Sequence, residues 1–444
     1  MKLIHSQFKY PLLILDLLRK NTTLTTLQWF EGQLFLDDKE FDVEIKKHEK
    51  KILLGGKEFL AMVDETGKWY SIATQTIPSQ LSEVLALITE SIKKMPQICL
   101  YHEAAKKIIL SHLPVEPEDR YEAYILFGLS AIPSKHFQQK ADLYDLALLI
   151  ERNKTLKKSF TSSPEKIIEK IQTFYINIHN RMLSHVRKYG WLSMVEKQMP
   201  SYDELDLIRE LKLLIKEANI KRSYQGYITW EKQIKKSSQR FMKRYHLTKN
   251  VLMLSDRAKA IAALMVQQQE ALQYLFFHFQ KLLAVDQEYQ RYEPAFLLNL
   301  KWDEFTALPK LPKRVPPQHY NHVRLQKQLL AQHLPKKKRA ALVKKIVLGG
   351  IANFTDKKKG VVGISKSTDA CSILVLNTFD KPADLFSDTA PSLVVVDEIP
   401  SIFSPFFPAL KAFPSMIGTQ VASHFCSQQQ RLLIDGKSNT LHFI

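Results

Sequence analysis

The chain has 444 residues, of which 45% are hydrophobic and 25% charged, and its 64 Lys and Arg against 45 Asp and Glu give a formal net charge of +19. A chain of this size can bury two or three hydrophobic cores, so we expect more than one domain. It has no apolar run of about 18 residues, and Lys9 and Asp16 interrupt its apolar start, which argues against a membrane span and a signal peptide and predicts a cytoplasmic location.

Residues 1–95 are expected to form a mixed α/β region in which no residue pattern indicates chemistry. Short apolar runs separated by polar turns favour strands, and a longer run with helical spacing favours a helix. The expected elements are strands at Gln33 to Leu36 and Lys51 to Leu54, a hairpin of Glu58 to Val63 and Lys68 to Ile72 around Asp64-Glu65-Thr66-Gly67, and a helix at Leu81 to Lys94.

Residues 96–308 are expected to form a mainly helical domain. Arg257 to Ala284 places apolar residues such as Ile261, Leu264, Phe276 and Phe279 at helical spacing, which predicts a long core helix. Prolines interrupt the helical pattern at several points and predict helix ends there. These prolines are Pro114, Pro117, Pro133, Pro164 and Pro200.

Residues 309–345 are predicted to be a basic linker rich in Pro and Lys. Lys310 to Lys359 contains fourteen Lys and Arg and one acid, Asp356, so this stretch holds most of the excess positive charge. The prolines favour a semi-rigid connector with one short helix from about His319 to Gln332. The charge fits either a solvated connector or a surface for an anionic partner. With only Tyr320 and Phe354 to stack on bases, the stretch argues against nucleic acid.

Residues 346–444 are expected to form a small β/α domain, which makes the whole chain an α+β protein with a helical centre. Short apolar runs alternate here with polar turns. The expected strands are Ile346 to Leu348, Val361 to Ile364, Ile373 to Leu376 and Leu393 to Val396.

His424 is the residue in this domain with the clearest chemical potential. A neutral imidazole is one of the few side chains that can accept a phosphoryl group and pass it on near neutral pH. Ser423 is a good N-cap for a helix from Phe425 to Leu432, and a helix N-terminus favours a bound phosphate. We therefore expect His424 to be exposed at the N-terminus of a helix.

The residues before His424 follow an order found in one enzyme family. The apolar strand Leu393 to Val396 is followed by Pro400, by Ser404 to Phe407 and by Ser423-His424. This order resembles the phosphohistidine domain of the PEP-utilising enzymes, which include PEP synthase, pyruvate phosphate dikinase and rifampin phosphotransferase. The resemblance implies a swivelling domain in which His424 carries a phosphoryl group between two active sites.

Several positions depart from the pattern of that family. Thr419 and Gln420 stand where the family has two glycines, Gln430 replaces an Arg that here comes one place later, and a Gly-Ile-Pro-Ala-Val segment is missing. Glycines at such a site let the backbone approach a phosphate closely. The phosphate-binding residues that the resemblance implies are Gly418, Thr419 and Ser423.

Two helical segments are similar to rifampin phosphotransferase-like proteins. Tyr292 to Leu298 with Trp302 to Phe305 resembles the stretch that precedes the phosphohistidine domain, and Tyr189 to Leu192 followed by Tyr202 to Leu205 resembles a Tyr-Gly-Trp segment. No part of the chain resembles the nucleotide-binding ATP-grasp half or the barrel that handles PEP. The resemblance therefore implies an orphan C-terminal half.

Two functions remain open at this point. The first is a phosphohistidine carrier, a phosphotransferase component that receives phosphate on His424 from Mg-ATP on a separate ATP-grasp-type chain and passes it to a small acceptor. The second is a catalytically inactive relative that acts as a binding or scaffold protein. In both, we expect the chain alone to bind no nucleotide.

Three other patterns carry less weight. Gly360 to Ser367 resembles a phosphate-binding P-loop, but Ser365 stands where the motif needs a glycine. His319 and His322 have no accompanying carboxylate or Cys, so we expect no metal site. The cysteines Cys99, Cys371 and Cys426 have no disulfide or zinc spacing, and Cys426 is expected to be a packed side chain.

Overall fold

The structure is a computed structural model, and it describes most of the chain. The described residues are 1–5, 12–22, 24–30, 33–113, 115–127, 134–192, 202–216, 220–290, 292, 297, 300, 302–308, 336–363, 373–376, 391–397, 407–420, 422–426 and 430–444. The predicted helix at His319 to Gln332 and most of the predicted linker lie outside these residues.

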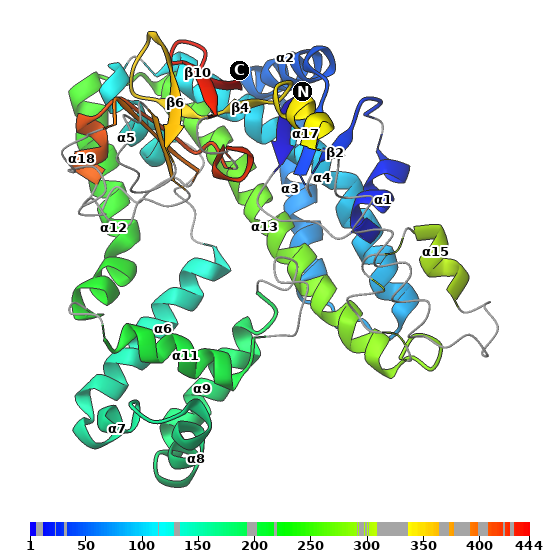
Figure 1. Cartoon of the computed structure of the whole chain (residues 1–444), viewed down its shortest axis with the longest axis vertical. Coiled ribbons are helices and arrows are strands. Elements are labelled where there is room, and N and C mark those ends of the chain that lie inside the picture. The colour runs from blue at the N-terminus through cyan, green and yellow to red at the C-terminus, as the bar shows by residue number, and fades with distance from the viewer. Residues whose placement is uncertain are drawn as a thin grey trace.

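The chain is an α+β protein in which helices predominate, as the sequence predicts. Figure 1 shows the long helices α4 and α13 side by side, with a sheet at one end of the molecule and a smaller helical lobe at the other. The helices are α1 Leu12–Asn21, α2 Asp38–Leu54, α3 Lys57–Ala73, α4 Leu81–His112, η1 Pro117–Asp119, α5 Arg120–Phe127, α6 Lys135–Arg152, α7 Lys154–Ser159, α8 Pro164–Phe174, α9 Ile176–Tyr189, α11 Glu204–Leu214, α12 Ile220–Tyr245, α13 Lys249–Val285, α15 Trp302–Ala307, α17 Lys336–Val343, α18 Phe407–Ala412 and α19 Ala422–Phe425.

Among the described residues, eleven strands form one mixed sheet that combines both ends of the chain, in the order β2-β3-β1-β4-β11-β10-β6-β7-β8-β9-β5. Strands β6 to β9 are parallel to one another, as are β1 and β4, and the other pairs are antiparallel. The strands are β1 Lys2–His5, β2 Gln28–Phe30, β3 Gln33–Leu36, β4 Val347–Gly349, β5 Ile351–Ala352, β6 Lys357–Gly363, β7 Ile373–Leu376, β8 Leu393–Val396, β9 Ser415–Ile417, β10 Arg431–Asp435 and β11 Thr440–Phe443.

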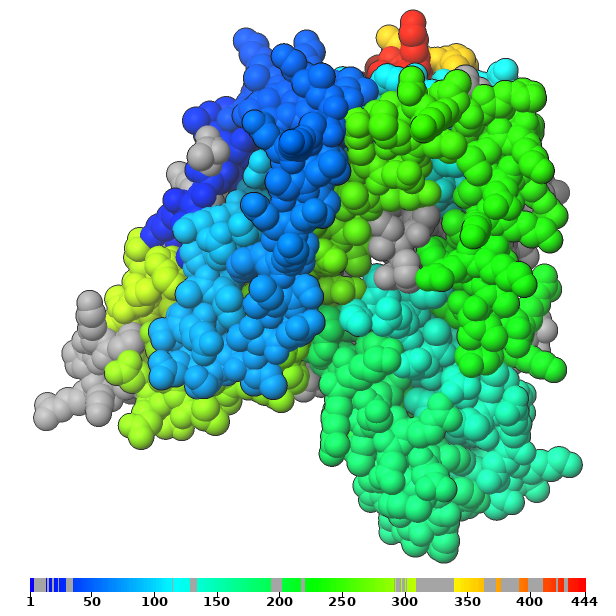
Figure 2. Space-filling view, turned by 180° about the vertical axis from the view of Figure 1, so that it is seen from behind, coloured from blue at the N-terminus to red at the C-terminus, as the bar shows by residue number. Residues whose placement is uncertain are grey.

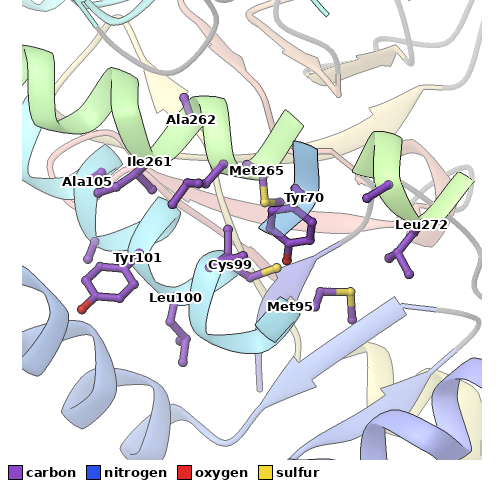
Figure 3. Close-up of a cluster of buried hydrophobic side chains, with 14 of the residues drawn as sticks. Tyr70, Met95, Cys99, Leu100, Tyr101, Ala105, Ile261, Ala262, Met265 and Leu272 are labelled. Carbon is purple, nitrogen blue, oxygen red and sulfur yellow. The ribbon is translucent and has the colours of Figure 1, made fainter. Parts of the chain in front are cut away.

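The main core lies between α4 and α13, whose apolar residues recur at helical spacing. Figure 3 shows Tyr70 of α3 among these side chains, together with Met95 and Cys99 of α4 and Met265 of α13. Burial raises the pKa of the Cys99 thiol, so this cysteine remains a neutral packing group. The predicted core helix at Arg257 to Ala284 is therefore confirmed as part of α13.

The sheet packs against this core with one face and covers a second core with the other. In β8, Val394 and Val396 join the core of α4 and α13, whereas Leu393 and Val395 point into the second core. The alternation follows from the two-residue period of a strand. Because both faces are covered, all four residues of β8 are buried, which explains the unbroken apolar run in the sequence.

The smaller lobe has a core of its own, built from α6, α7, α8, α9 and α11. It joins the rest of the molecule through α12, which packs against α6 and α5. The lobe also contacts α13, because the Glu270 carboxylate accepts a hydrogen bond of 2.5 Å from the backbone N–H of Lys135. Burial raises the pKa of Glu270 above its usual value.

The predicted strand at Lys51 to Leu54 and the predicted hairpin after it are both wrong. Lys51 to Leu54 ends α2, and the hairpin residues form the continuous helix α3. The buried residues Phe59, Tyr70 and Ala73 lie on one face of that helix. Gly67, which suggested a turn, instead faces α13, where a Cβ atom would lie 3.4 Å from Gln267 Oε1.

The C-terminal strands were predicted more closely than the C-terminal helix. Ile373 to Leu376 and Leu393 to Val396 are confirmed as β7 and β8, and the two other predicted strands overlap β4 and β6. The predicted helix from Phe425 to Leu432 is wrong, because α19 ends at Phe425 and β10 begins at Arg431. Buried Leu432 and Ile434 alternate with more exposed neighbours, which is the period of a strand.

Asp119 holds the sheet end of the molecule to its helices. Its buried carboxylate accepts hydrogen bonds from Lys411 Nζ at 2.6 Å and from Tyr245, and it forms an ion pair of 2.8 Å with Arg244. Burial acts to raise the pKa of Asp119, but these hydrogen bonds and the two positive charges outweigh it and hold the pKa below its usual value. Lys411 belongs to α18, so this ion pair links distant parts of the sequence.

Gly67→Ala should stabilise the protein by about 0.5–1 kcal/mol, because alanine is the better residue inside a helix. Its Cβ would meet Gln267 and Leu264 at no less than 3.4 Å. Gly226→Ala in α12 is the matched control, since a Cβ there meets nothing within 4 Å. Urea unfolding would measure both variants, and a clear loss of stability in Gly67→Ala would contradict the helix.

Asp119→Asn should cost about 1–3 kcal/mol at neutral pH, because it leaves buried donors without a charged acceptor. Since the folded pKa of Asp119 is depressed, its contribution is complete above the unfolded value of about 3.9 and disappears as the pH falls through the folded pKa. Urea unfolding at several pH values should show the wild-type advantage shrinking in acid. Asp303→Asn, at an exposed ion pair with Lys20, should change little.

Candidate functional site

The candidate site lies at the carboxyl ends of the parallel strands β8 and β9. Val396 pairs with Ile417 in the register of these strands, so the residues that follow, Asp397 and Gly418, emerge next to each other. Carboxyl ends of parallel strands are where ligands bind in open α/β sheets. The sequence-predicted residues Gly418, Thr419, Ser423 and His424 are thus brought to one edge of the sheet.

Asp397 is buried at the centre of this edge. Its Oδ1 atom accepts hydrogen bonds from Thr419 Oγ1 at 2.7 Å and from the backbone N–H of Ala422 at 2.6 Å. Its Oδ2 atom accepts hydrogen bonds from the backbone N–H of Ser423 at 3.0 Å and from the Ser423 hydroxyl. Four donors therefore converge on one carboxylate, which is 3% exposed.

The Asp397 carboxylate caps the short helix α19 from a distant part of the sequence. Ser423 was expected to be the N-cap, but α19 begins at Ala422, so Ser423 is the second residue of a four-residue helix. The free N–H groups at the start of the helix point to Asp397 instead. In the sequence, Asp397 is the first polar residue after an apolar strand, and this local pattern does not reveal the long-range cap.

The turn between β9 and α19 contains two left-handed residues. Gly418 has φ of 70° and Gln420 has φ of 69°, with buried Thr419 between them. Gln420 donates its backbone N–H to the Asp397 carbonyl oxygen at 3.0 Å, which helps to hold a conformation that glycine would adopt without strain.

His424 is half-buried rather than exposed, which differs from the sequence expectation. Its Nε2 atom is shielded from solvent, and its ring meets the edge of the Phe425 ring at 5.0 Å between centroids. Phe425 is itself part of the second core of the sheet. Packing of this helix against the sheet therefore draws His424 inward.

The remaining residues of the predicted motif lie around this site or outside the described residues. Pro400 and Ser404 to Phe406 fall outside them. Arg431 is the first residue of β10 and pairs with Val361, so it belongs to the sheet ladder. Burial, together with the nearby Asp397 carboxylate, raises the pKa of Cys426 to about 12, which keeps its thiol protonated.

The two helical segments around Tyr189 and Tyr202 meet at a buried histidine. The ring of His185 lies 4.9 Å from that of Tyr189 and 6.1 Å from that of Tyr202, and burial lowers its pKa to about 4. A Cβ on Gly190 would lie 2.5 Å from the carbonyl oxygen of Val186 and 3.2 Å from that of Tyr202. The Gly190 backbone is thus closely packed within the small lobe, whereas Trp191 packs against Tyr274 of α13.

Other site types receive no support from the described residues. Gly360 and Gly363 both lie within β6, and Gly360 pairs with Leu432 in an antiparallel ladder, whereas a P-loop leaves its strand at the first glycine. Lys366 and Ser365 lie outside the described residues. Within the described ranges, no group of three or more His, Cys, Asp and Glu side chains could hold a metal ion, and no helix could cross a membrane.

No protein-family model matches this chain, and a search of curated proteins also finds no match. The assignment to the PEP-utilising enzymes therefore stays a prediction that depends on the motif residues alone. The geometry around Asp397 is independent of that assignment and can be tested directly.

Asp397→Asn should lower stability by about 1–3 kcal/mol. The NH₂ group of the new amide would face hydrogen-bond donors that the carboxylate now accepts from, and those donors would lose their acceptor. Thermal or urea unfolding would measure the loss. Asp435→Asn is the control, since Asp435 also accepts two backbone N–H bonds, from Lys437 and Ser438, but lies at the end of β10 and is less buried than Asp397. Equal, small effects of the two substitutions would contradict the central role of Asp397.

Proposed function

We propose that this chain is a non-catalytic binding or scaffold protein with a phosphohistidine-like C-terminal unit. One observation carries the proposal, namely that Asp397 accepts the hydrogen bonds that Thr419, Ala422 and Ser423 direct into the site. A phosphate would need those same donors. It would also have to approach a buried negative charge, which is unfavourable at low dielectric constant.

The position of His424 supports the same proposal. A nucleophile must reach its phosphorus atom in line and at close distance. The Nε2 atom of His424 is shielded from solvent, and the ring packs against Phe425. Phosphate transfer at this nitrogen would require α19 to move away from the sheet. That movement would break the hydrogen bonds that Asp397 accepts from α19.

A phosphohistidine carrier is the second candidate, and one observation favours it. Thr419, Ser423 and His424 lie together at the carboxyl ends of parallel strands, where a phosphate site is expected. In this role the chain would be a phosphotransferase component, with Mg-ATP on a separate ATP-grasp-type chain in the cytoplasm and a small-molecule phosphate acceptor. Asp397 would then have to be displaced in each transfer.

Labelling of the protein in an extract of its source cells distinguishes the two candidates. With ATP labelled in its γ-phosphate, the extract supplies any partner chain, and the protein is recovered and treated with acid or base. The proposed binding role predicts no acid-labile, base-stable label on the wild type. Phosphoramidate, a donor that needs no partner, modifies exposed histidines such as His112 and His246, so peptide mapping after this treatment should find those residues phosphorylated and His424 unmodified.

His424→Ala is the decisive variant, and His112→Ala, at an exposed histidine of α4, is its matched control. An acid-labile label that His424→Ala abolishes and His112→Ala retains would establish the carrier and overturn the binding role. Identical, unlabelled proteins in all three samples are the result that we expect.

A further inference from the structure

Helix α12 presents an unusually basic face to solvent. It contains eight Lys and Arg, and its only acid is Glu231. All eight basic residues are exposed. They are Lys221, Arg222, Lys232, Lys235, Lys236, Arg240, Lys243 and Arg244.

The basic residues lie on one side of the helix in two groups, Lys221 with Arg222 and, after nine residues without Lys or Arg, Lys232 to Arg244. At about 100° of rotation per residue, the eight side chains fall within roughly half of the helix circumference, on the side opposite Phe241. Phe241 is buried in the main core, and Tyr227 and Trp230 pack against the ring of Phe137 from α6. Glu231 lies outside the basic arc. Figure 2 shows α12, in green, along an open edge of the molecule.

These charges are not neutralised by neighbouring acids. Arg244 pairs with Asp119, but none of the other seven has an ion-pair partner within 4 Å among the residues that the structure describes. The contrast with α2 is clear, because its five lysines are matched by five acids. In and around that helix, Lys47 pairs with Glu44, Lys2 with Asp42 and Lys107 with Glu49. The charges of α2 are therefore balanced, and those of α12 are not.

We infer that the basic face of α12 binds the phosphate backbone of nucleic acid without sequence preference. Lys221 and Arg244 are 23 residues apart, which corresponds to roughly 35 Å of helix, about the length of one turn of duplex. Closely spaced phosphates along such a length attract a row of cations and release their counterions when they bind.

Two other anionic partners fit this surface less well. An amphipathic helix that binds membranes needs a free apolar face, but the apolar face of α12 is already packed against α5 and α6. An acidic protein would offer carboxylates without the regular linear spacing of a phosphate backbone. The shortage of aromatic residues in the basic linker does not bear on α12, because backbone binding requires no base stacking.

This inference gives a partner class to the binding role proposed above, and it uses no residue of the Asp397 site. The two proposals fail separately, because phosphorylation of His424 is measured by labelling, whereas α12 is tested by binding.

Fluorescence anisotropy of the full chain tests the inference, with labelled DNA duplex, RNA duplex and single-stranded DNA of about 20 nucleotides, over a range of salt concentrations. We expect micromolar dissociation constants and a linear fall of log K with log salt concentration. Replacing Lys232, Lys235, Lys236 and Arg240 by Gln should weaken duplex binding at least about tenfold in low salt and flatten the slope by about 3 to 4.

The matched control removes four lysines from α2, namely Lys39, Lys46, Lys50 and Lys51, also by replacement with Gln. All four are exposed, so the control lowers the net charge by the same amount at another helix. Its affinity and slope should stay near those of the wild type. An equal loss in both variants would mean that binding follows total charge, and it would overturn the assignment to α12.

A gain-of-function variant keeps the test valid if the quadruple substitution unfolds. Glu231→Lys extends the basic face, and it should raise affinity and steepen the salt slope by about 1. Competition by polyglutamate as effective as competition by unlabelled duplex would overturn the nucleic-acid assignment. So would α12-dependent binding to vesicles of anionic lipid in the absence of duplex binding.

Discussion

Burial of strand β8 on both faces is the constraint on which the two largest cores of the molecule depend. Val394 and Val396 pack with the helices, and Leu393 and Val395 pack with α17, α19 and the rest of the sheet. The first residue after the strand still lies inside this layer, before the chain reaches the surface. Asp397 is therefore buried, and a buried carboxylate is stable only when hydrogen bonds replace the water that it loses.

The turn and the helix that follow β9 provide those hydrogen bonds. Thr419 and the N-terminus of α19 provide the donors, and the left-handed residues Gly418 and Gln420 aim the backbone toward Asp397. A buried carboxylate and a bound phosphate are stabilised by the same kind of site, a ring of N–H and O–H donors at a helix N-terminus. Here the anion is part of the chain, so the same arrangement of residues serves a structural purpose.

Local sequence patterns predicted the elements whose signals are local. Ile373 to Leu376 and Leu393 to Val396 are recognisable as buried strands because they are short and wholly apolar. The turn predicted at Asp64-Glu65-Thr66-Gly67 is wrong, because Gly67 packs against α13, a helix that is distant in the sequence. The long-range contacts of Asp397 and the half-buried position of His424 could not be predicted for the same reason, since both depend on pairing between β8 and β9.

The entry of β1 into the sheet has a consequence for the order of folding. The amino group of Met1 donates a hydrogen bond of 2.8 Å to the carbonyl oxygen of Lys345, and Lys2 pairs with Val347. Contacts of such long sequence separation form late, because the chain between them must first be closed into a loop. We therefore expect that, during synthesis, the edge of β1 that pairs with β4 stays unpaired until β4 has left the ribosome. That interval exposes a pairing edge to other chains, so we expect the unpaired edge of β1 to favour aggregation during synthesis.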